Sequence, residues 1–87
     1  MARVLMYCTA ACPFCQSAER LLAEKGAQVD KVRVDLEPER RSEMVQKSGG
    51  RRTVPQIWIG EQHVGGCDDL YALDRKGGLD PLLKANS

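Results

Sequence analysis

The chain has 87 residues, which is enough for one domain, over residues 1–87, with a single hydrophobic core. Its hydrophobic content of 43% with 29% charged residues is that of a globular domain and not of a disordered chain. Thirteen basic and twelve acidic side chains leave a formal net charge of +1. This balance gives no sign of a nucleic-acid-binding surface or a polybasic membrane anchor.

No apolar run approaches the roughly 18 residues of a membrane span, and the first residues lack the basic, apolar and small segments of a signal peptide. We therefore expect a cytoplasmic protein. The four cysteines are then expected to be catalytic or buried thiols, since a reducing compartment does not favour a disulfide scaffold. A monomer is the default expectation, because neither composition nor patterning addresses the oligomeric state.

The first half of the chain predicts a strand, a helix and a second strand. Residues 3–8 form a short, continuous apolar run typical of a central strand. An amphipathic helix begins at Pro13 and ends at Gly26, with an apolar stripe predicted at Phe14, Ala18, Leu21 and Leu22. Residues 29–36 alternate between apolar and polar, as in a strand with one wet face. Short connections make this a parallel strand–helix–strand unit of an α/β fold.

The second half predicts a thinly amphipathic helix, a hairpin and two closing helices. In chain order we expect a helix over 38–48, strands over 56–59 and 63–64 joined by a turn, a helix from 67 to Gly77-Gly78, and a last helix within 79–83. Asp68 or its neighbour is the expected N-cap of the third helix. Asp80 is the expected N-cap of the fourth, with Pro81 at its first position.

Cys12 and Cys15 stand where the first strand gives way to the first helix. Proline suits the first helical position, so Pro13 places Cys12 at the helix start, where unpaired backbone N–H groups and the macrodipole favour an anion. The thiolate is the nucleophile of disulfide exchange. Cys15 lies within the first turn, so it is placed to attack a mixed disulfide formed on Cys12.

A C-x-x-C motif can also form a structural disulfide or hold zinc. A structural disulfide that closes so short a loop removes little entropy from the unfolded chain. A zinc site needs four ligands, and the remaining candidates, Cys8, His63 and Cys67, do not repeat a zinc-knuckle spacing. We therefore expect redox chemistry and no metal ligation at this motif.

Four further features have a default interpretation. Cys8 is expected to be a small buried hydrophobe, His63 a surface residue on a strand, and Trp58 a core residue on the face opposite its neighbours Ile57 and Ile59. The most basic neighbourhood is either a solvated surface or a contact for an anionic ligand, and it comprises Arg40, Arg41, Lys47, Arg51 and Arg52.

The chain resembles a dithiol glutaredoxin of the small bacterial type over essentially its whole length. The residues that carry the resemblance are Tyr7, Cys12-Pro13-Phe14-Cys15, Thr53-Val54-Pro55 and Gly65-Gly66-Cys67-Asp68-Asp69-Leu70. The resemblance implies a thioredoxin-like fold, in which helices flank a four-stranded mixed sheet. It also implies a cis Pro55 facing the cysteines, and glutathione as co-substrate with no tightly bound cofactor.

By the same resemblance, the backbone of Val54 would pair with the cysteinyl unit of glutathione. The γ-glutamyl carboxylate would lie on the N–H groups of Cys67 and Asp68, and the Asp68 carboxylate would accept from the ligand's ammonium group. A basic residue near Arg40 or Arg41 would meet the glycyl carboxylate. The implied glutathione-binding set is Thr53, Val54, Pro55, Gly66, Cys67 and Asp68.

The chain departs from the family pattern at Thr9, where many relatives carry a lysine three residues before the nucleophile. Without that cation, the helix start must supply more of the stabilisation of the Cys12 thiolate. Phe14 replaces a common tyrosine and keeps its aromatic surface. Thr9, Pro13 and Phe14 are expected to border the reactive thiol without reacting.

The predicted function is a glutathione-dependent thiol–disulfide oxidoreductase acting on disulfide-containing and glutathionylated proteins. One alternative is an iron–sulfur cluster carrier that uses Cys12 from two subunits and two glutathiones, which Pro13 disfavours by family resemblance. Another is a redoxin served by thioredoxin reductase, which the Gly65–Asp69 helix start disfavours because it suits a ligand carboxylate.

Overall fold

The computed structural model of the chain describes residues 3–86. The elements in chain order are β1 (Arg3–Cys8), α1 (Pro13–Glu24), β2 (Gln28–Arg33), α2 (Pro38–Lys47), β3 (Gln56–Ile59), β4 (Gln62–Gly65), α3 (Cys67–Arg75) and α4 (Leu79–Ala85). Within this range, no helix has the length and apolar character that crossing a membrane requires.

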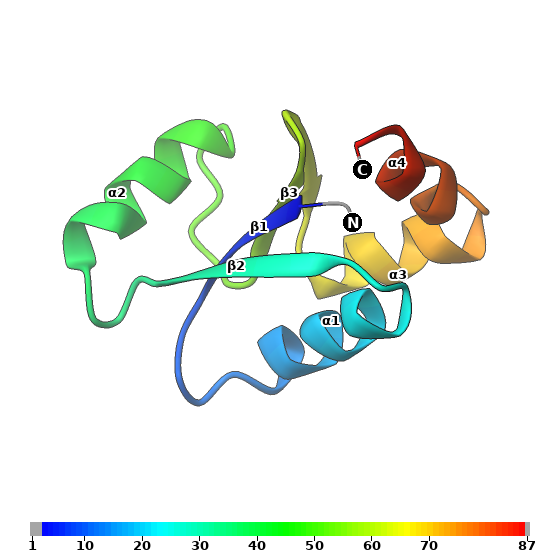
Figure 1. Cartoon of the computed structure of the whole chain (residues 1–87). Coiled ribbons are helices and arrows are strands. Elements are labelled where there is room, and N and C mark those ends of the chain that lie inside the picture. Colours follow the sequence, from blue (N-terminus) through cyan, green and yellow to red (C-terminus); the bar gives the residue numbers. More distant parts are fainter. Residues whose placement is uncertain (1–2, 87) are drawn as a thin grey trace.

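The four strands form one mixed sheet in the order β2-β1-β3-β4 (Figure 1). β1 is parallel to β2 and antiparallel to β3, and β3 is antiparallel to β4. β1 is thus a central strand, as its apolar run predicts, and the parallel strand–helix–strand unit is confirmed. Since Cys8 pairs with Arg33 and Tyr7 pairs with Gln56, the carboxyl end of β1 lies between the end of β2 and the start of β3.

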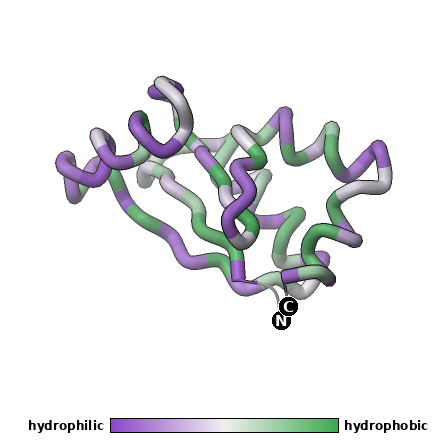
Figure 2. Tube along the Cα trace, turned by 90° about the horizontal axis from the view of Figure 1, so that it is seen from above, coloured by the Kyte–Doolittle hydropathy of each residue, from purple (hydrophilic) through white to green (hydrophobic). Residues whose placement is uncertain are grey.

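Helices cover both faces of the sheet, and each face has its own core. On one face, α1, α3 and α4 pack against the sheet through side chains that include Met6, Leu22 and Leu70. On the other face, α2 contributes Met44 to a cluster with Tyr7, Val32, Val34 and Trp58. The predicted opposite placement of Trp58 and its neighbours is confirmed. Figure 2 shows α2, at the left, as mostly hydrophilic, which agrees with its thin apolar stripe.

Two sequence predictions about the first half are wrong. β2 ends at Arg33 and does not continue to Leu36, because the amides of Leu36 and Glu37 bond back to the Arg33 carbonyl and turn the chain toward α2. Leu36 is left 69% exposed beyond that turn. Phe14 does not pack on the sheet either, since it is 61% exposed at the first turn of α1, where Cys15 faces inward instead.

The caps of the last two helices also differ from the prediction. Gly66 is the N-cap of α3, and Asp69 satisfies the Gly66 amide from three residues further along. α4 begins at Leu79 after Gly78, before the predicted cap at Asp80. Burial of Leu79 anchors this earlier start, and Pro81 is tolerated because first-turn amides have no intrahelical acceptor.

Candidate active site

Cys12 is the N-cap of α1, as the sequence predicts. Its backbone is extended, Pro13 follows at the first helical position, and the Cys12 carbonyl accepts from the Gln16 amide at 3.1 Å. The Cys15 amide donates to Cys12 Sγ at 3.2 Å. A sulfur in this position meets a first-turn N–H group and the positive end of the helix dipole, and both favour its anionic form.

Cys15 has the opposite environment. Burial, followed by the hydrogen bond with the Cys12 side chain, raises the pKa of Cys15 to about 12. Only 5% of its surface is exposed. Cys15 is therefore a neutral thiol at physiological pH, and it is placed to react only after a bond to sulfur has formed on Cys12.

The loop before β3 approaches Cys12 from the opposite side. The Val54–Pro55 peptide bond is cis, as the family resemblance implies. Cys12 Sγ lies 4.0 Å from the Val54 carbonyl oxygen, within the limit for a weak hydrogen bond from a thiol. The reactive sulfur therefore lies between the start of α1 and this loop.

A groove of about 250 Å³ continues from this point between the loop before β3 and the start of α3. Its lining residues are Phe14, Arg51, Thr53, Val54, Pro55, Gly66, Cys67, Asp68 and Asp69. All six residues predicted to bind glutathione thus lie along one groove, although their part in binding remains a prediction. Of the other three, Phe14 is a residue expected to border the reactive thiol, whereas the pair formed by Arg51 and Asp69 is what the sequence reasoning missed.

The α3 end of the groove combines a helix start with a fixed pair of charges. Asp69 Oδ2 accepts from the Gly66 amide at 2.9 Å and from Arg51 Nη2 at 3.2 Å. These two contacts, the amide first, lower the pKa of Asp69. Because Asp69 takes up the Gly66 amide, the amides of Cys67 and Asp68 are the ones left for a ligand carboxylate.

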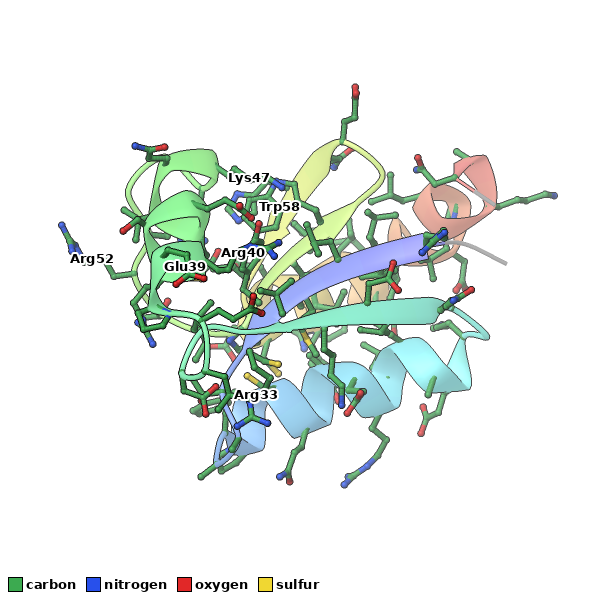
Figure 3. All side chains as sticks on the ribbon, turned by 60° about the vertical axis from the view of Figure 1, so that its left-hand side comes forward. Arg33, Glu39, Arg40, Lys47, Arg52 and Trp58 are labelled. Carbon is green, nitrogen blue, oxygen red and sulfur yellow. The ribbon has the colours of Figure 1, made fainter. Side chains whose placement is uncertain are left out.

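The basic residues predicted to reach the ligand are not the ones that line the groove. Arg40 Nε donates to Glu43 at 3.2 Å, and Arg41 Nη1 donates to the Arg52 carbonyl at 3.1 Å, so both are held on the α2 side. Figure 3 shows Arg52 pointing away from the sheet. Arg51 is the basic residue on the groove. No local signal distinguishes Arg51 from its neighbours, because the choice depends on how the loop after α2 folds back.

Both cysteines outside the motif, Cys8 and Cys67, are buried. For Cys8 this confirms the prediction of a small buried hydrophobic residue. Burial raises the pKa of both Cys8 and Cys67. Thr9 lines a second cavity of about 190 Å³, shared with Cys8 and Cys15, and not the groove itself. Within residues 3–86, no group of three or more His, Cys, Asp or Glu side chains is arranged to hold a metal ion.

His63 is not the simple surface residue that the sequence predicts. It is half-buried, its ring stacks on Trp58 with centroids 4.5 Å apart, and its Nε2 lies 2.8 Å from Gln56 Oε1. Burial, and then the nearby Arg51, lower its pKa. His63 does not line the groove, so it is not placed to act as a base on a ligand there.

Comparison with known proteins agrees with this geometry. The glutaredoxin family model matches residues 4–64. The chain is 54% identical over 84 residues to Glutaredoxin 3 of Escherichia coli strain K12, covering 97% of this chain and all of that protein. The solution structure of a Brucella melitensis glutaredoxin matches with a TM-score of 0.84 at 50% identity, over 100% of this chain and 94% of that one. A crystal structure described as a buckwheat glutaredoxin–glutathione complex matches with a TM-score of 0.88 at 29% identity, over 97% of this chain and 78% of that one. Family model, sequence relatives and fold together show that the chain belongs to the glutaredoxins, the thiol–disulfide oxidoreductases that act with glutathione.

Proposed function

We propose that this glutaredoxin reduces both protein–glutathione mixed disulfides and protein disulfides, with Cys12 as the nucleophile and Cys15 as the resolving thiol. The observation that carries the proposal is the placement of Cys12 Sγ, which accepts from the first-turn amide of Cys15 and lies 4.0 Å from the carbonyl oxygen of Val54, a residue that lines the groove. The buckwheat relative solved as a glutathione complex supports glutathione as that peptide.

Glutathione would occupy the groove with its sulfur toward Cys12. Its cysteinyl backbone would pair with Val54, as an extended peptide adds to a strand. Its γ-glutamyl carboxylate would lie on the amides of Cys67 and Asp68, with the ammonium group on the Asp68 carboxylate. Arg51, rather than Arg40 or Arg41, is the basic residue that lines this groove, and its contact with Asp69 places it at the α3 end, on the side of the γ-glutamyl carboxylate.

On a glutathionylated protein, the Cys12 thiolate attacks the glutathionyl sulfur. The protein leaves as a thiolate that takes a proton from water, and Cys12 holds glutathione in a mixed disulfide. A second glutathione thiolate attacks the glutathionyl sulfur, forms glutathione disulfide and restores the Cys12 thiolate. This cycle does not require Cys15.

On a protein disulfide, Cys12 forms a mixed disulfide with one substrate sulfur. Cys15 loses its proton as it attacks Cys12 Sγ, the substrate leaves with both sulfurs reduced, and a Cys12–Cys15 disulfide remains. Two glutathiones then reduce that disulfide. The neutral state of Cys15 before this step keeps it from competing with Cys12 for the substrate.

The test is a pair of serine variants assayed on both substrates. Cys12→Ser should abolish both activities, whereas Cys15→Ser should retain deglutathionylation and lose most of the reduction of protein disulfides. Full turnover by Cys12→Ser would overturn the assignment of the nucleophile. Equal loss of both activities in Cys15→Ser would overturn the division of roles.

The source of electrons is tested with the unmodified protein. Turnover should depend on glutathione and glutathione reductase, and thioredoxin reductase should not replace them. Efficient reduction by thioredoxin reductase alone would favour the redoxin alternative, and an iron–sulfur absorption spectrum after anaerobic purification would favour the cluster carrier.

A further inference from the structure

Gln56 is a fully buried polar residue directly behind the groove, at the first position of β3. Its side-chain Nε2 lies 3.0 Å from the Thr53 carbonyl oxygen and 3.3 Å from Thr53 Oγ1. Its Oε1 lies 2.8 Å from His63 Nε2. One buried amide thus joins a groove residue on one side to β4 on the other.

The Thr53 carbonyl oxygen fixes the direction of every hydrogen bond in this series from Thr53 through Gln56 to His63. A backbone carbonyl oxygen can only accept, so the side-chain atom that faces the Thr53 carbonyl must be the amide nitrogen of Gln56. Gln56 Oε1 therefore faces His63 and accepts from it. His63 must carry a proton on Nε2, and Thr53 Oγ1 must accept from Gln56.

His63 is held in place to make this contact. It pairs with Trp58 across the β3–β4 ladder, and the two rings stack at 29°. Lys47 lies over the Trp58 ring with its Nζ 4.7 Å from the centroid, as the labelled side chains in Figure 3 indicate. The orientation of the Gln56 amide is therefore set by packing on the face of the sheet that α2 covers.

We propose that Gln56 is a positioning residue for glutathione. Its side-chain amide holds the Thr53 peptide, which precedes Val54, in place. The same amide donates to the Thr53 hydroxyl oxygen, so the proton of that hydroxyl is left to be donated into the groove. The proposal rests on the groove being the glutathione site. Thr53 is exposed and lines the groove, so its hydroxyl can reach a carbonyl or carboxylate oxygen of the ligand. The Thr53 carbonyl sets the orientation of the Gln56 amide, and the contact of Gln56 Oε1 with His63 Nε2 holds that orientation.

Two substitutions at Gln56 separate this role from simple packing. Gln56→Glu keeps the shape and the acceptor for His63, but it removes the donor to Thr53 and turns the Thr53 hydroxyl proton away from the groove. Gln56→Leu removes both contacts. Both should raise the KM for glutathione by about tenfold, the effect of losing one well-oriented hydrogen bond, and change kcat less than about twofold.

The matched control is Gln62→Leu, at an exposed glutamine of the same hairpin, which should leave both constants unchanged. The rate of Cys12 alkylation should also be unchanged in the Gln56 variants, because the helix start is untouched. A KM equal to that of the unsubstituted protein would refute the proposal, as would a parallel loss of kcat, alkylation rate and thermal stability, which is the signature of core damage alone. If Gln56→Leu does not fold, Gln56→Glu decides.

A spectroscopic readout on the unsubstituted protein is independent of activity. Nitrogen-15 NMR of the His63 ring at pH 7.5 should show a neutral imidazole protonated on Nε2. Protonation on Nδ1 alone would reverse the hydrogen bonds and refute the chain of donors. If glutathione fails to bind but the Nε2 tautomer is found, the proposed function fails and the orientation of Gln56 stands.

Discussion

Cys15 should be far less reactive in the folded protein than in the unfolded chain, and its raised pKa gives the size of the difference. A thiol with a pKa of about 12 is ionised to about one part in 10⁵ at pH 7. An ordinary cysteine, with a pKa of about 8.5, is ionised to about 3%. Since alkylation consumes the thiolate, folded Cys15 should react about 10³-fold more slowly than the same residue in the unfolded chain.

The assay is alkylation by iodoacetamide at pH 7, followed by mass spectrometry of the tryptic peptide 4–20. The Cys12→Ser variant isolates Cys15 in that peptide apart from Cys8, and fragment masses separate the two. Burial, the main cause of the raised pKa, persists in this variant. Alkylation of folded Cys15 within about tenfold of the rate in denaturant would refute the assignment of a buried, neutral resolving thiol.

Three further predictions test the surroundings of the site. Arg51→Gln should raise the KM for glutathione about three- to tenfold by removing a charged donor, whereas Arg41→Gln, off the groove, should not. Equal effects of the two substitutions would contradict the assignment of Arg51, in place of Arg41, as the basic residue on the groove. Gly65→Ala should lower the free energy of unfolding at least about 1 kcal/mol more than Gly77→Ala in denaturant titrations, since both glycines have positive φ but only at Gly65 would a Cβ overlap the Asp69 carboxylate. The free energy of unfolding should also fall as pH rises above about 9. Burial raises the pKa of the Tyr7 phenol and of the Cys8, Cys15 and Cys67 thiols, so these groups ionise in the unfolded chain first. An unfolding free energy that is flat from pH 8 to 10.5 would contradict this.

Features that depend on neighbouring residues in the sequence could be predicted. Pro13 fixes the start of α1, and so it places Cys12 at the N-cap without any tertiary information. The alternation around Trp58 puts its ring on the face opposite Ile57 and Ile59, which in the structure is the face that α2 covers. Gly26, with φ of 76°, ends α1 as expected, because glycine adopts the left-handed conformation without strain.

Features that depend on how distant segments of the chain meet could not be predicted from the sequence. Arg51 lies on the groove because the loop after α2 folds back over α3, and nothing within residues 38–52 distinguishes it from Arg40 or Arg41. The N-cap of α3 is Gly66, which has no side chain to signal a cap, and its partner Asp69 lies three residues away. The cis bond before Pro55 follows from the family resemblance and not from the residues alone.

The most direct test of the account is to identify which sulfur accepts glutathione. The Cys15→Ser variant, incubated with glutathione disulfide at pH 7 and analysed as intact protein and as peptides, should gain one glutathionyl group, and that group should lie on Cys12. Cys8 and Cys67 should remain unmodified, because burial raises the pKa of both thiols and so keeps them in the unreactive neutral form. An adduct on either of them in place of Cys12, or no adduct at all, would contradict the claim that the start of α1 and the adjoining groove form the glutathione-dependent active site.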